Sequence, residues 1–469
     1  MALKKTKILC TIGPASLSEQ TLGMMYEAGM NAARINTAYG DIDQYKDAIT
    51  KVRRVGDIPI LFDLKGPELR IHVSKPISLK EGDILNIGEA MGATFTHPVY
   101  DQLKVGDRVL FDDAKIQTEV AGSDKETLSL LVRAGGLLED GKGVNCPARS
   151  FHVPTLTERD VTLVEFAKEQ DVEFICLSFT RDANDIENLK REIGNSGIGI
   201  ISKIENNQGV AAFNQILSAA DGVMIARGDL AIEVDQERVP LLQKRMIAAS
   251  NQVGKTVITA TEMLESMSKN IRPTRAEVSD VANAILDGTD VVMLSGETAV
   301  GKYPVEAVAT MSKIALATEE AVACKVEKEE YQNISNAISW SVAEIARSMP
   351  LDTVVTITRT GYTARAIARF KLKQQIIAVT KDPLVKRKLE LAYGVRPVHL
   401  LYHDDDDRIL SAARALHEMK MVNEQNIVLF TAAFRTSVRH SSNLIEIHTI
   451  KELIEFMSHP ATLISRDCV

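Results

Sequence analysis

The chain repeats a unit in which a short apolar run is followed by a segment with apolar residues at helical spacing. Eight such runs occur between residues 7 and 295, and many of them stop in charged or polar residues. Strands that alternate with helices predict a parallel β/α sheet. The first three units would suit an open sheet as well as a closed one, but eight units fit a (β/α)8 TIM barrel, whose active face lies at the C-terminal ends of the strands.

Two stretches depart from this repeat. Residues 71–152 show short alternating runs and glycine-rich turns without a helical period, which predicts an inserted β-barrel lid domain. A polar segment at residues 326–330 precedes further strand and helix patterns, which predict an open-sheet α/β domain. We therefore expect a barrel domain in two parts (1–70 and 153–325), a lid (71–152) and a C-terminal, regulatory α/β domain (326–469).

Residues 200–229 carry the most unusual pattern, because two buried strands in this stretch end in charged side chains. Lys203 and Glu205 are two residues apart, so strand alternation places them on one face. Asp229 follows Glu205 by 24 residues, about one strand–helix unit, and so reaches the exit of a neighbouring strand. Two carboxylates beside an ammonium indicate a divalent metal site next to a cationic catalytic group. A structural ion pair is the alternative.

The bulk composition excludes several classes of protein. The 469 residues carry a formal charge of −8 without a basic run, which argues against nucleic acid as a partner. Neither a signal peptide nor an apolar window of membrane-spanning length is evident. The cysteines occur singly, without metal-ligand spacing, at positions 10, 146, 176, 324 and 468. These features predict a cytoplasmic protein with reduced thiols.

Several long motifs, in order along the chain, resemble the pyruvate kinase family. They are Ile201-Ser-Lys-Ile-Glu-Asn206, Met224-Ile-Ala-Arg-Gly-Asp-Leu230, Met293-Leu-Ser-Gly-Glu-Thr298 and the run from Arg272-Pro-Thr-Arg-Ala-Glu277 to Asp287-Gly288. The resemblance covers essentially the whole chain. It implies a cytoplasmic, homotetrameric glycolytic enzyme that transfers the phosphoryl group of phosphoenolpyruvate to ADP, giving pyruvate and ATP.

The resemblance also implies roles for individual residues. Glu205 and Asp229 match the ligands of Mg²⁺ (or Mn²⁺), and hard carboxylate oxygens suit that ion. Lys203 matches the cation that stabilises the transferring phosphoryl group and the enolate oxygen. The other matches are the following: Arg34 for the substrate phosphate, the Gly228 and Asp229 N–H groups with Thr261 for the substrate carboxylate, Thr261 and Ser295 for a proton path to the enolate, and Asn36, Arg70 and Lys142 for the nucleotide.

The chain departs from the family at positions near a monovalent-cation site. The family's Asn-Phe-Ser-His is Asn36-Thr-Ala-Tyr39 here, so Ala38 removes one hydroxyl ligand of K⁺. The remaining K⁺ ligands implied by the resemblance are Asn36, Asp63 and the carbonyl of Leu64, which replaces the family's threonine. Relatives that dispense with K⁺ tend to carry lysine where this chain has Glu68. We therefore expect K⁺ to stimulate the enzyme but to bind weakly.

Two further departures are Ala231, where the family has glycine, and Glu262, where it has glutamine. Their effect does not follow from the sequence. In the C-terminal domain, the strand–helix loop with Thr358, Thr360, Gly361 and Thr363 resembles the loop that holds a sugar phosphate in some pyruvate kinases. The glycine-rich effector segment of those relatives is not recognisable at residues 431–442, so an ordinary strand–helix turn remains the alternative.

Two other motifs resemble binding sites, one for phosphate and one for a metal ion, but a structural role explains each of them better. Residues 296–302 nearly complete a P-loop, but Tyr303 replaces the required Ser or Thr and Pro304 follows. The acidic run at residues 404–407 precedes a helix, where carboxylates favour the positive end of the dipole, so we predict a structural role rather than a metal site.

Two other functions remain as alternatives to the pyruvate kinase reaction. One is a different Mg²⁺-dependent barrel enzyme that acts on pyruvate or phosphoenolpyruvate, such as a lyase; the insertion and the third domain argue against it. The other is a ligand-sensing relative without turnover. The departures permit it, but Lys203, Glu205 and Asp229 are all retained.

Overall fold

The computed structural model describes residues 4–147, 149, 151, 153–324, 333–402, 407–433 and 442–458. Eight parallel strands close into a barrel in the order β1-β17-β16-β15-β14-β13-β3-β2. These strands are β1 (Lys7–Ile12), β2 (Ala32–Asn36), β3 (Ile60–Asp63), β13 (Phe174–Leu177), β14 (Gly199–Ile204), β15 (Gly222–Ala226), β16 (Thr256–Ala260) and β17 (Val291–Leu294). The expected (β/α)8 barrel is therefore confirmed.

Helices surround the barrel strands, and their N-termini begin at capping residues that the sequence makes visible. Asp41, Thr157 and Thr274 each form a capping box with the third helical residue. The helices are α1 (Glu19–Glu27), α2 (Ile42–Val55), α3 (Glu158–Glu169), α4 (Ala183–Ile193), α5 (Asn207–Ala211), α6 (Phe213–Ala219), α7 (Arg227–Glu233), α8 (Val239–Val253), α9 (Arg275–Asp287), α10 (Gly296–Ala299) and α11 (Pro304–Glu319). Between β14 and β15 the chain forms two short helices, α5 and α6, which meet at Ala212, rather than one continuous helix.

The inner surface of the barrel explains why polar residues stand at its mouth. One buried cluster inside the barrel includes Ala32, Leu61 and Ile201. Alternation along each strand places the residue two positions later on the same inner face. Those residues are Arg34, Asp63 and Lys203. Apolar packing thus fills the lower barrel, and the next inward position on each strand carries a charge.

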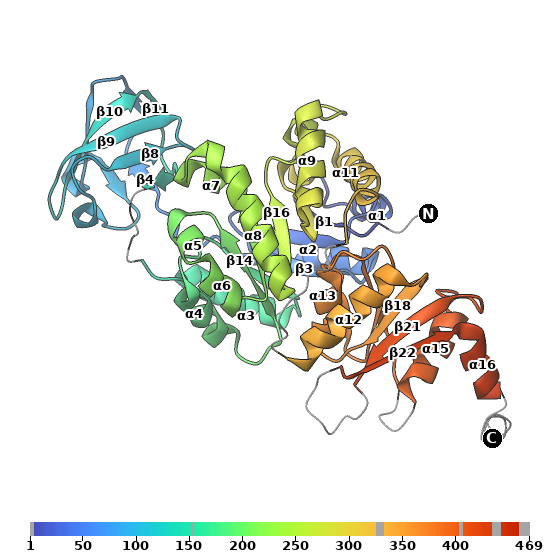
Figure 1. Cartoon of the computed structure of the whole chain (residues 1–469). Helices are drawn as coiled ribbons and strands as arrows, with labels where there is room; N and C mark the ends of the chain where they lie inside the picture. Colours follow the sequence, from blue (N-terminus) through green and yellow to red (C-terminus); the bar gives the residue numbers. More distant parts are fainter. Residues whose placement is uncertain are drawn as a thin grey trace.

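The lid projects from the C-terminal end of the barrel (Figure 1), with its own buried core. Its strands are β4 (Ile71–Val73), β5 (Ile77–Leu79), β6 (Ile84–Ile87), β7 (Ala93–Phe95), β8 (Arg108–Phe111), β9 (Ile116–Ser123), β10 (Leu128–Ala134), β11 (Gly136–Leu138) and β12 (Val144–Asn145). The segments that leave and re-enter the barrel pair with each other: Ile71 donates to the carbonyl of Lys142 (3.0 Å), and Val144 donates to that of Leu69 (2.8 Å). The lid therefore hangs on a ribbon of two strands.

The C-terminal domain lies at the opposite end of the molecule from the lid (Figure 1). Its sheet has the order β20-β19-β18-β21-β22, with β22 antiparallel. The elements are α12 (Ile334–Ser348), β18 (Thr353–Ile357), α13 (Tyr362–Ala368), β19 (Gln375–Thr380), α14 (Pro383–Leu389), β20 (Val395–His399), α15 (Arg408–Glu418), β21 (Ile427–Ala432), β22 (Leu444–Thr449) and α16 (Ile450–Ser458). The open α/β sheet is as expected; β22 and α16 were not foreseen.

Charged contacts join this domain to the base of the barrel. Lys371 pairs with Asp290 at 2.6 Å, and both side chains are almost fully buried. Arg387 of α14 donates to Glu173, which also accepts from Arg53 at 2.8 Å. Leu391, just after α14, belongs to the cluster inside the barrel. Among the described residues, we find no helix with the length and apolar character needed to cross a membrane.

Candidate active site

Lys203 lies at the centre of the barrel mouth, where it is held by side chains from three strands. Its Nζ is 2.8 Å from Glu205 Oε1 and 3.5 Å from Asp63 Oδ1, and it donates to Ser178 Oγ at 2.7 Å. Glu205 is fixed in turn by the backbone N–H of Phe179 at 2.7 Å. The structure therefore brings Lys203 and Glu205 together on one face, as strand alternation predicts.

Arg34 approaches the same point from the neighbouring strand. It donates to Asp63 Oδ2 through Nε (2.7 Å), its second nitrogen lies 2.6 Å from that oxygen, and its third donates to Thr11 Oγ1 at 3.0 Å. Asp63 is only 1% exposed and thus lies between two cations. Asp63 orients Arg34 and Lys203 toward the same space, which suits them to an anionic substrate.

The pKa shifts follow from burial and from this clustering of charges. Burial lowers the pKa of Lys203, but Asp63 and Glu205 outweigh burial, so the pKa lies above the ordinary lysine value. Burial raises the pKa of Glu205; Lys203 opposes that rise, and the charge of Asp229 adds to it. Burial also raises the pKa of Asp229, with added repulsion from Glu68, Asp113 and Asp63. The barrel mouth thus holds the Lys203 ammonium together with more carboxylate charge than this one ammonium neutralises.

Asp229 lies in the first turn of α7, the helix that follows β15 directly. Gly228, the residue before it, donates its N–H to Thr261 Oγ1 at 2.8 Å. Arg227 anchors the start of the helix through hydrogen bonds to the carbonyl of Thr261 (2.6 Å) and to Asp280 (2.8 Å). Thr261 and Glu262 both have positive φ angles, 66° and 53°, so this loop is in a conformation that side chains with a Cβ rarely adopt.

Ser295 is the first residue after β17, the strand next to β16. Its hydroxyl is buried and has no hydrogen-bond partner within the described part of the chain, while its N–H donates to Glu297 Oε2 at 2.7 Å. An unpaired buried hydroxyl is costly, and such atoms occur where a substrate or a water completes the site. Glu297 is itself buried, and burial raises its pKa.

The carboxylates at the mouth fit a divalent cation that keeps several water and substrate ligands. No group of three His, Cys, Asp or Glu side chains that could hold a metal occurs in the part of the chain that the structure describes. Glu205 is buried and Asp229 is partly buried, and burial raises the pKa of both. Repulsion from Asp229 raises the pKa of Glu205 further, and repulsion from the surrounding carboxylates does the same for Asp229. A hard dication relieves that repulsion, and Mg²⁺ commonly takes only one or two protein carboxylates.

The residues matched to the nucleotide lie where the lid joins the barrel. Arg70 pairs with Glu68 at 2.7 Å, and it faces Gly143 in an antiparallel bridge. Lys142, one residue earlier, pairs with Asp112 and Glu139, each at 3.2 Å. Both cations are therefore close to the joint, but each is bound to carboxylates of this chain.

The expected K⁺ ligands are also brought together. Asn36 and Asp63 are direct neighbours in the β2–β3 register, and Leu64 follows. The carbonyl of Leu64 accepts from Ser178 Oγ at 2.7 Å, and Asn36 Oδ1 accepts from the N–H of Ala38 at 3.1 Å. Asn36 Oδ1 and the Leu64 carbonyl thus already accept a hydrogen bond in this structure, and the Asp63 carboxylate contacts both Arg34 and Lys203.

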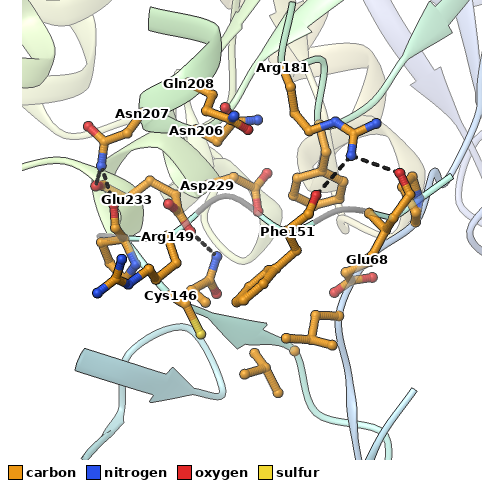
Figure 2. A pocket seen from close by; sticks show the side chains of 18 of the residues that line it. Glu68, Cys146, Arg149, Phe151, Arg181, Asn206, Asn207, Gln208, Asp229 and Glu233 are labelled. Carbon is orange, nitrogen blue, oxygen red and sulfur yellow. Dashed lines mark hydrogen bonds between the residues drawn. The ribbon is translucent and has the colours of Figure 1, made fainter. Parts of the chain in front are cut away.

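A cavity of about 300 Å³ opens between the lid and the barrel loops, and Figure 2 shows Glu68, Asn206, Asp229 and Glu233 around it. A second cavity, on the other side of α7, is lined by Asp229, Glu233 and Glu262. Ser178 and Glu233 were missed from the sequence, because a lone serine after a strand and a glutamate at a helix end carry no distinctive signal.

The strand–helix loop of the C-terminal domain keeps its hydroxyls occupied. Thr358 Oγ1 accepts from the N–H of Gly361 at 3.0 Å, and Thr363 Oγ1 lies 2.8 Å from Ser442 Oγ. Thr360 is exposed. Of the segment 431–442, residues 434–441 lie outside the described residues, as do Asp404–Asp406 of the acidic run. Asp407 caps α15 through the N–H groups of Ile409 and Leu410, which confirms the structural role for that residue.

Comparison with known proteins decides the family. Residues 3–308 match the pyruvate kinase barrel domain and residues 336–448 the pyruvate kinase alpha/beta domain. The chain belongs to the pyruvate kinase family. The pyruvate kinase of Geobacillus stearothermophilus is 42% identical over 476 residues, covering 96% of this chain and 81% of that protein. That of Bacillus licheniformis is 41% identical with the same coverage.

A solved structure agrees with this assignment. The crystal structure of a pyruvate kinase from Cryptosporidium parvum superposes with a TM-score of 0.89 at 33% identity, covering 95% of this chain and 96% of that one. Members of the family transfer the phosphoryl group of phosphoenolpyruvate to ADP, and they need a divalent metal ion and K⁺. This protein is accordingly an enzyme of the phosphotransferase class.

Proposed function

We propose that this chain carries out the pyruvate kinase reaction with Lys203 as the central catalytic group. The observation that carries the proposal is the position of Lys203, a buried ammonium between Glu205 and Asp63 at the barrel mouth. Phosphoryl transfer spreads negative charge over the moving group, so catalysis depends on positioning and on fixed positive charge. Lys203 and Arg34 supply that charge from a rigid strand end.

Glu205 and Asp229 are the proposed Mg²⁺ ligands. A divalent cation at this point neutralises charge on the substrate phosphate and the enolate oxygen. The two carboxylates come from β14 and α7, elements held by the barrel core, so their separation is set before the metal binds. Asp63 is not assigned to Mg²⁺; its proposed role is to orient Arg34 and Lys203, which it contacts directly.

The substrate carboxylate is proposed to bind the N–H groups of Gly228 and Asp229 together with Thr261. Gly228 N–H and Thr261 Oγ1 are hydrogen-bonded to each other, so binding exchanges this contact for contacts to the substrate. Ser295 Oγ, just after β17, is buried and has no partner among the residues that the structure describes, which supports a role with Thr261 in a water-linked proton path to the enolate carbon.

The nucleotide phosphates are proposed to bind Arg70 and Lys142, with Asn36 nearby. These cations are paired with Glu68, Asp112 and Glu139, so ADP has to replace those carboxylates. Since these pairs are partly exposed, each costs little to break.

An assay coupled to lactate dehydrogenase, with ADP, Mg²⁺ and phosphoenolpyruvate, tests the proposal. We expect ADP-dependent pyruvate formation. A lyase would release pyruvate or consume it without ADP, and a ligand-sensing relative would bind phosphoenolpyruvate without turnover; either result would overturn the proposal.

The acidic residues at the barrel mouth lead us to expect that activity depends on K⁺. Glu68 and Asp63 keep the mouth acidic, and Glu68 contributes to the raised pKa of Asp229. Like charges ~4 Å apart repel by about 4 kcal/mol at an effective dielectric near 20, so a cation is needed beside the substrate anion. We expect K⁺ to stimulate turnover, with half-saturation at a higher concentration than in serine-containing relatives because Ala38 supplies no hydroxyl.

The measurement is a KCl titration at constant ionic strength with a bulky organic cation as filler. The variant Ala38→Ser, which restores the hydroxyl, is expected to lower the half-saturating K⁺ concentration. Full activity without K⁺ or NH₄⁺ would show that the charge argument is wrong.

We also propose that the loop with Thr358, Thr360, Gly361 and Thr363 binds a phosphorylated effector. A screen of sugar phosphates and nucleoside monophosphates is expected to find one that changes the cooperativity of phosphoenolpyruvate binding. The exposed Thr360 offers a probe, since Thr360→Val should weaken that response and leave basal turnover unchanged. If no compound acts, the loop is an ordinary strand–helix turn.

Three broader assignments complete the proposal. The domains are taken as 1–70 with 153–325, 71–152 and 326–469. The enzyme is proposed to be a homotetramer, as is usual in the family. It is placed in the cytoplasm, in keeping with the free thiols of Cys10, Cys146, Cys176 and Cys324.

A further inference from the structure

The lid is joined to the barrel by a narrow ribbon, so its orientation depends on contacts at its base. The ribbon consists of the residue pairs around Leu69–Val144 and Ile71–Lys142. Two strands alone form a marginally stable and easily twisted unit. Other contacts must therefore fix where the lid stands above the barrel mouth.

One such contact ties the lid to α7. Val144 of β12 is buried in the lid core, so alternation turns Asn145 to the opposite face. Asn145 Nδ2 donates to Glu233 Oε1 at 2.9 Å. Glu233 is the last residue of α7, one helical turn after Asp229.

A second residue strengthens the same junction. Asn207 donates through Nδ2 to the carbonyl of Pro147 at 2.9 Å and also to the backbone carbonyl of Glu233. Asn207 thus joins the lid chain, just beyond Asn145, to the end of α7. Figure 2 shows Asn207, Glu233 and Asp229 on the same wall of the cavity.

Glu233 is an unusual choice for a purely structural contact. No cation lies within ion-pair distance of it among the described residues, and the amide of Asn145 is the hydrogen-bond partner of its side chain there. Burial raises its pKa, and only the Asn145 hydrogen bond opposes that rise. A carboxylate in this position forms a strong, charge-assisted hydrogen bond with the amide of the lid, which suits it to hold the lid in place.

We propose that Asn145 and Glu233 are positioning residues of the phosphoryl-transfer reaction. Their hydrogen bond seats the lid on α7 and so sets the distance between Lys142, at the lid joint, and Asp229, one turn along the helix. The inference rests on the proposed function, because it concerns the nucleotide cation and the metal carboxylate of that reaction.

The test first removes the Asn145–Glu233 hydrogen bond and then restores it with donor and acceptor exchanged. Asn145→Asp places two carboxylates face to face, and we expect kcat to fall by about thirtyfold and KM for ADP to rise several-fold. KM for phosphoenolpyruvate should change by less than about twofold, since Arg34, Lys203 and Thr261 lie on the barrel. In the double variant Asn145→Asp with Glu233→Gln, the new amide donates to the new carboxylate, and activity should return to within about threefold of wild type.

Asn86→Asp is the matched control, because Asn86 lies on the exposed face of the lid and accepts from Ser129 at 2.8 Å, a bond that aspartate retains. Amide hydrogen exchange provides a readout independent of turnover: the amides of residues 142–146 should exchange faster in Asn145→Asp and recover in the double variant. If Asn145→Asp is misfolded by circular dichroism, Asn145→Ala and Glu233→Ala replace it, and their effects on kcat should be strongly non-additive.

The outcomes separate the two proposals. Wild-type enzyme that fails to form pyruvate from phosphoenolpyruvate and ADP would defeat the proposed function, while hydrogen exchange would still report on the lid. Active wild type with an unaffected Asn145→Asp variant, or a double variant no better than the single one, would overturn the positioning role. An equal rise in KM for ADP and in KM for phosphoenolpyruvate would also overturn the positioning role.

Discussion

Replacing Lys203 with methionine is expected to lower kcat by about a thousandfold or more while leaving divalent metal binding nearly intact. The methionine keeps the volume of the side chain but removes the ammonium that lies 2.8 Å from Glu205. Because that charge acts mainly on negative charge that develops in the transition state, the loss should appear in kcat rather than in the affinity for substrate.

Steady-state kinetics and Mn²⁺ binding measured by electron paramagnetic resonance check this expectation. Lys244→Met is the control, since Lys244 is exposed on α8 and pairs with Asp287 far from the mouth. A Lys203→Met enzyme that keeps more than about a tenth of wild-type turnover would rule out the central role of Lys203.

The second large effect is expected for Asp229→Asn. The substitution keeps the shape of the side chain and removes one of two carboxylates proposed to hold Mg²⁺. The half-saturating Mg²⁺ concentration should rise by about a hundredfold, and kcat/KM should fall by at least that factor. Asp235→Asn, which changes an exposed carboxylate just beyond α7, is the control.

The same substitution should make the metal-free protein more stable at neutral pH. Burial raises the pKa of Asp229, so the folded chain holds the proton more tightly than the unfolded chain does. Ionised Asp229 therefore lowers the free energy of unfolding as the pH rises from the unfolded toward the folded pKa, and the full cost is present above the folded pKa. Thermal melts at several pH values should show an advantage for Asp229→Asn that shrinks as the pH falls. An unchanged Mg²⁺ requirement, or no gain in melting temperature, would contradict the proposed role.

The barrel could be predicted from the sequence because its signals are local. Eight apolar runs separated by helical patterns define the fold, and the two-residue spacing of Lys203 and Glu205 places them on one face. The three polar residues at the mouth also follow from alternation, since Arg34, Asp63 and Lys203 each come two positions after a residue of the inner cluster.

Features that depend on distant parts of the chain could not be predicted. Asn145 and Glu233 are 88 residues apart in sequence, and neither has a pattern that points to the other. The break between α5 and α6 lies in a segment whose apolar spacing suits one continuous helix, and tertiary packing overrides that preference. β22 is a different case: Ile445 and Ile447 alternate with Glu446 and His448, so this strand was missed although its sequence carries the signal.

Leu391 gives the barrel a property that its strands alone do not have. This side chain comes from the C-terminal domain, yet it packs in the same cluster as Ile201, which stands two residues before Lys203 on the inner face of β14. Close-packed interiors transmit small displacements rather than absorb them. The Lys203 ammonium and the C-terminal domain are therefore linked through one cluster of packed side chains, and a residue of the neighbouring domain completes the inner packing of the barrel.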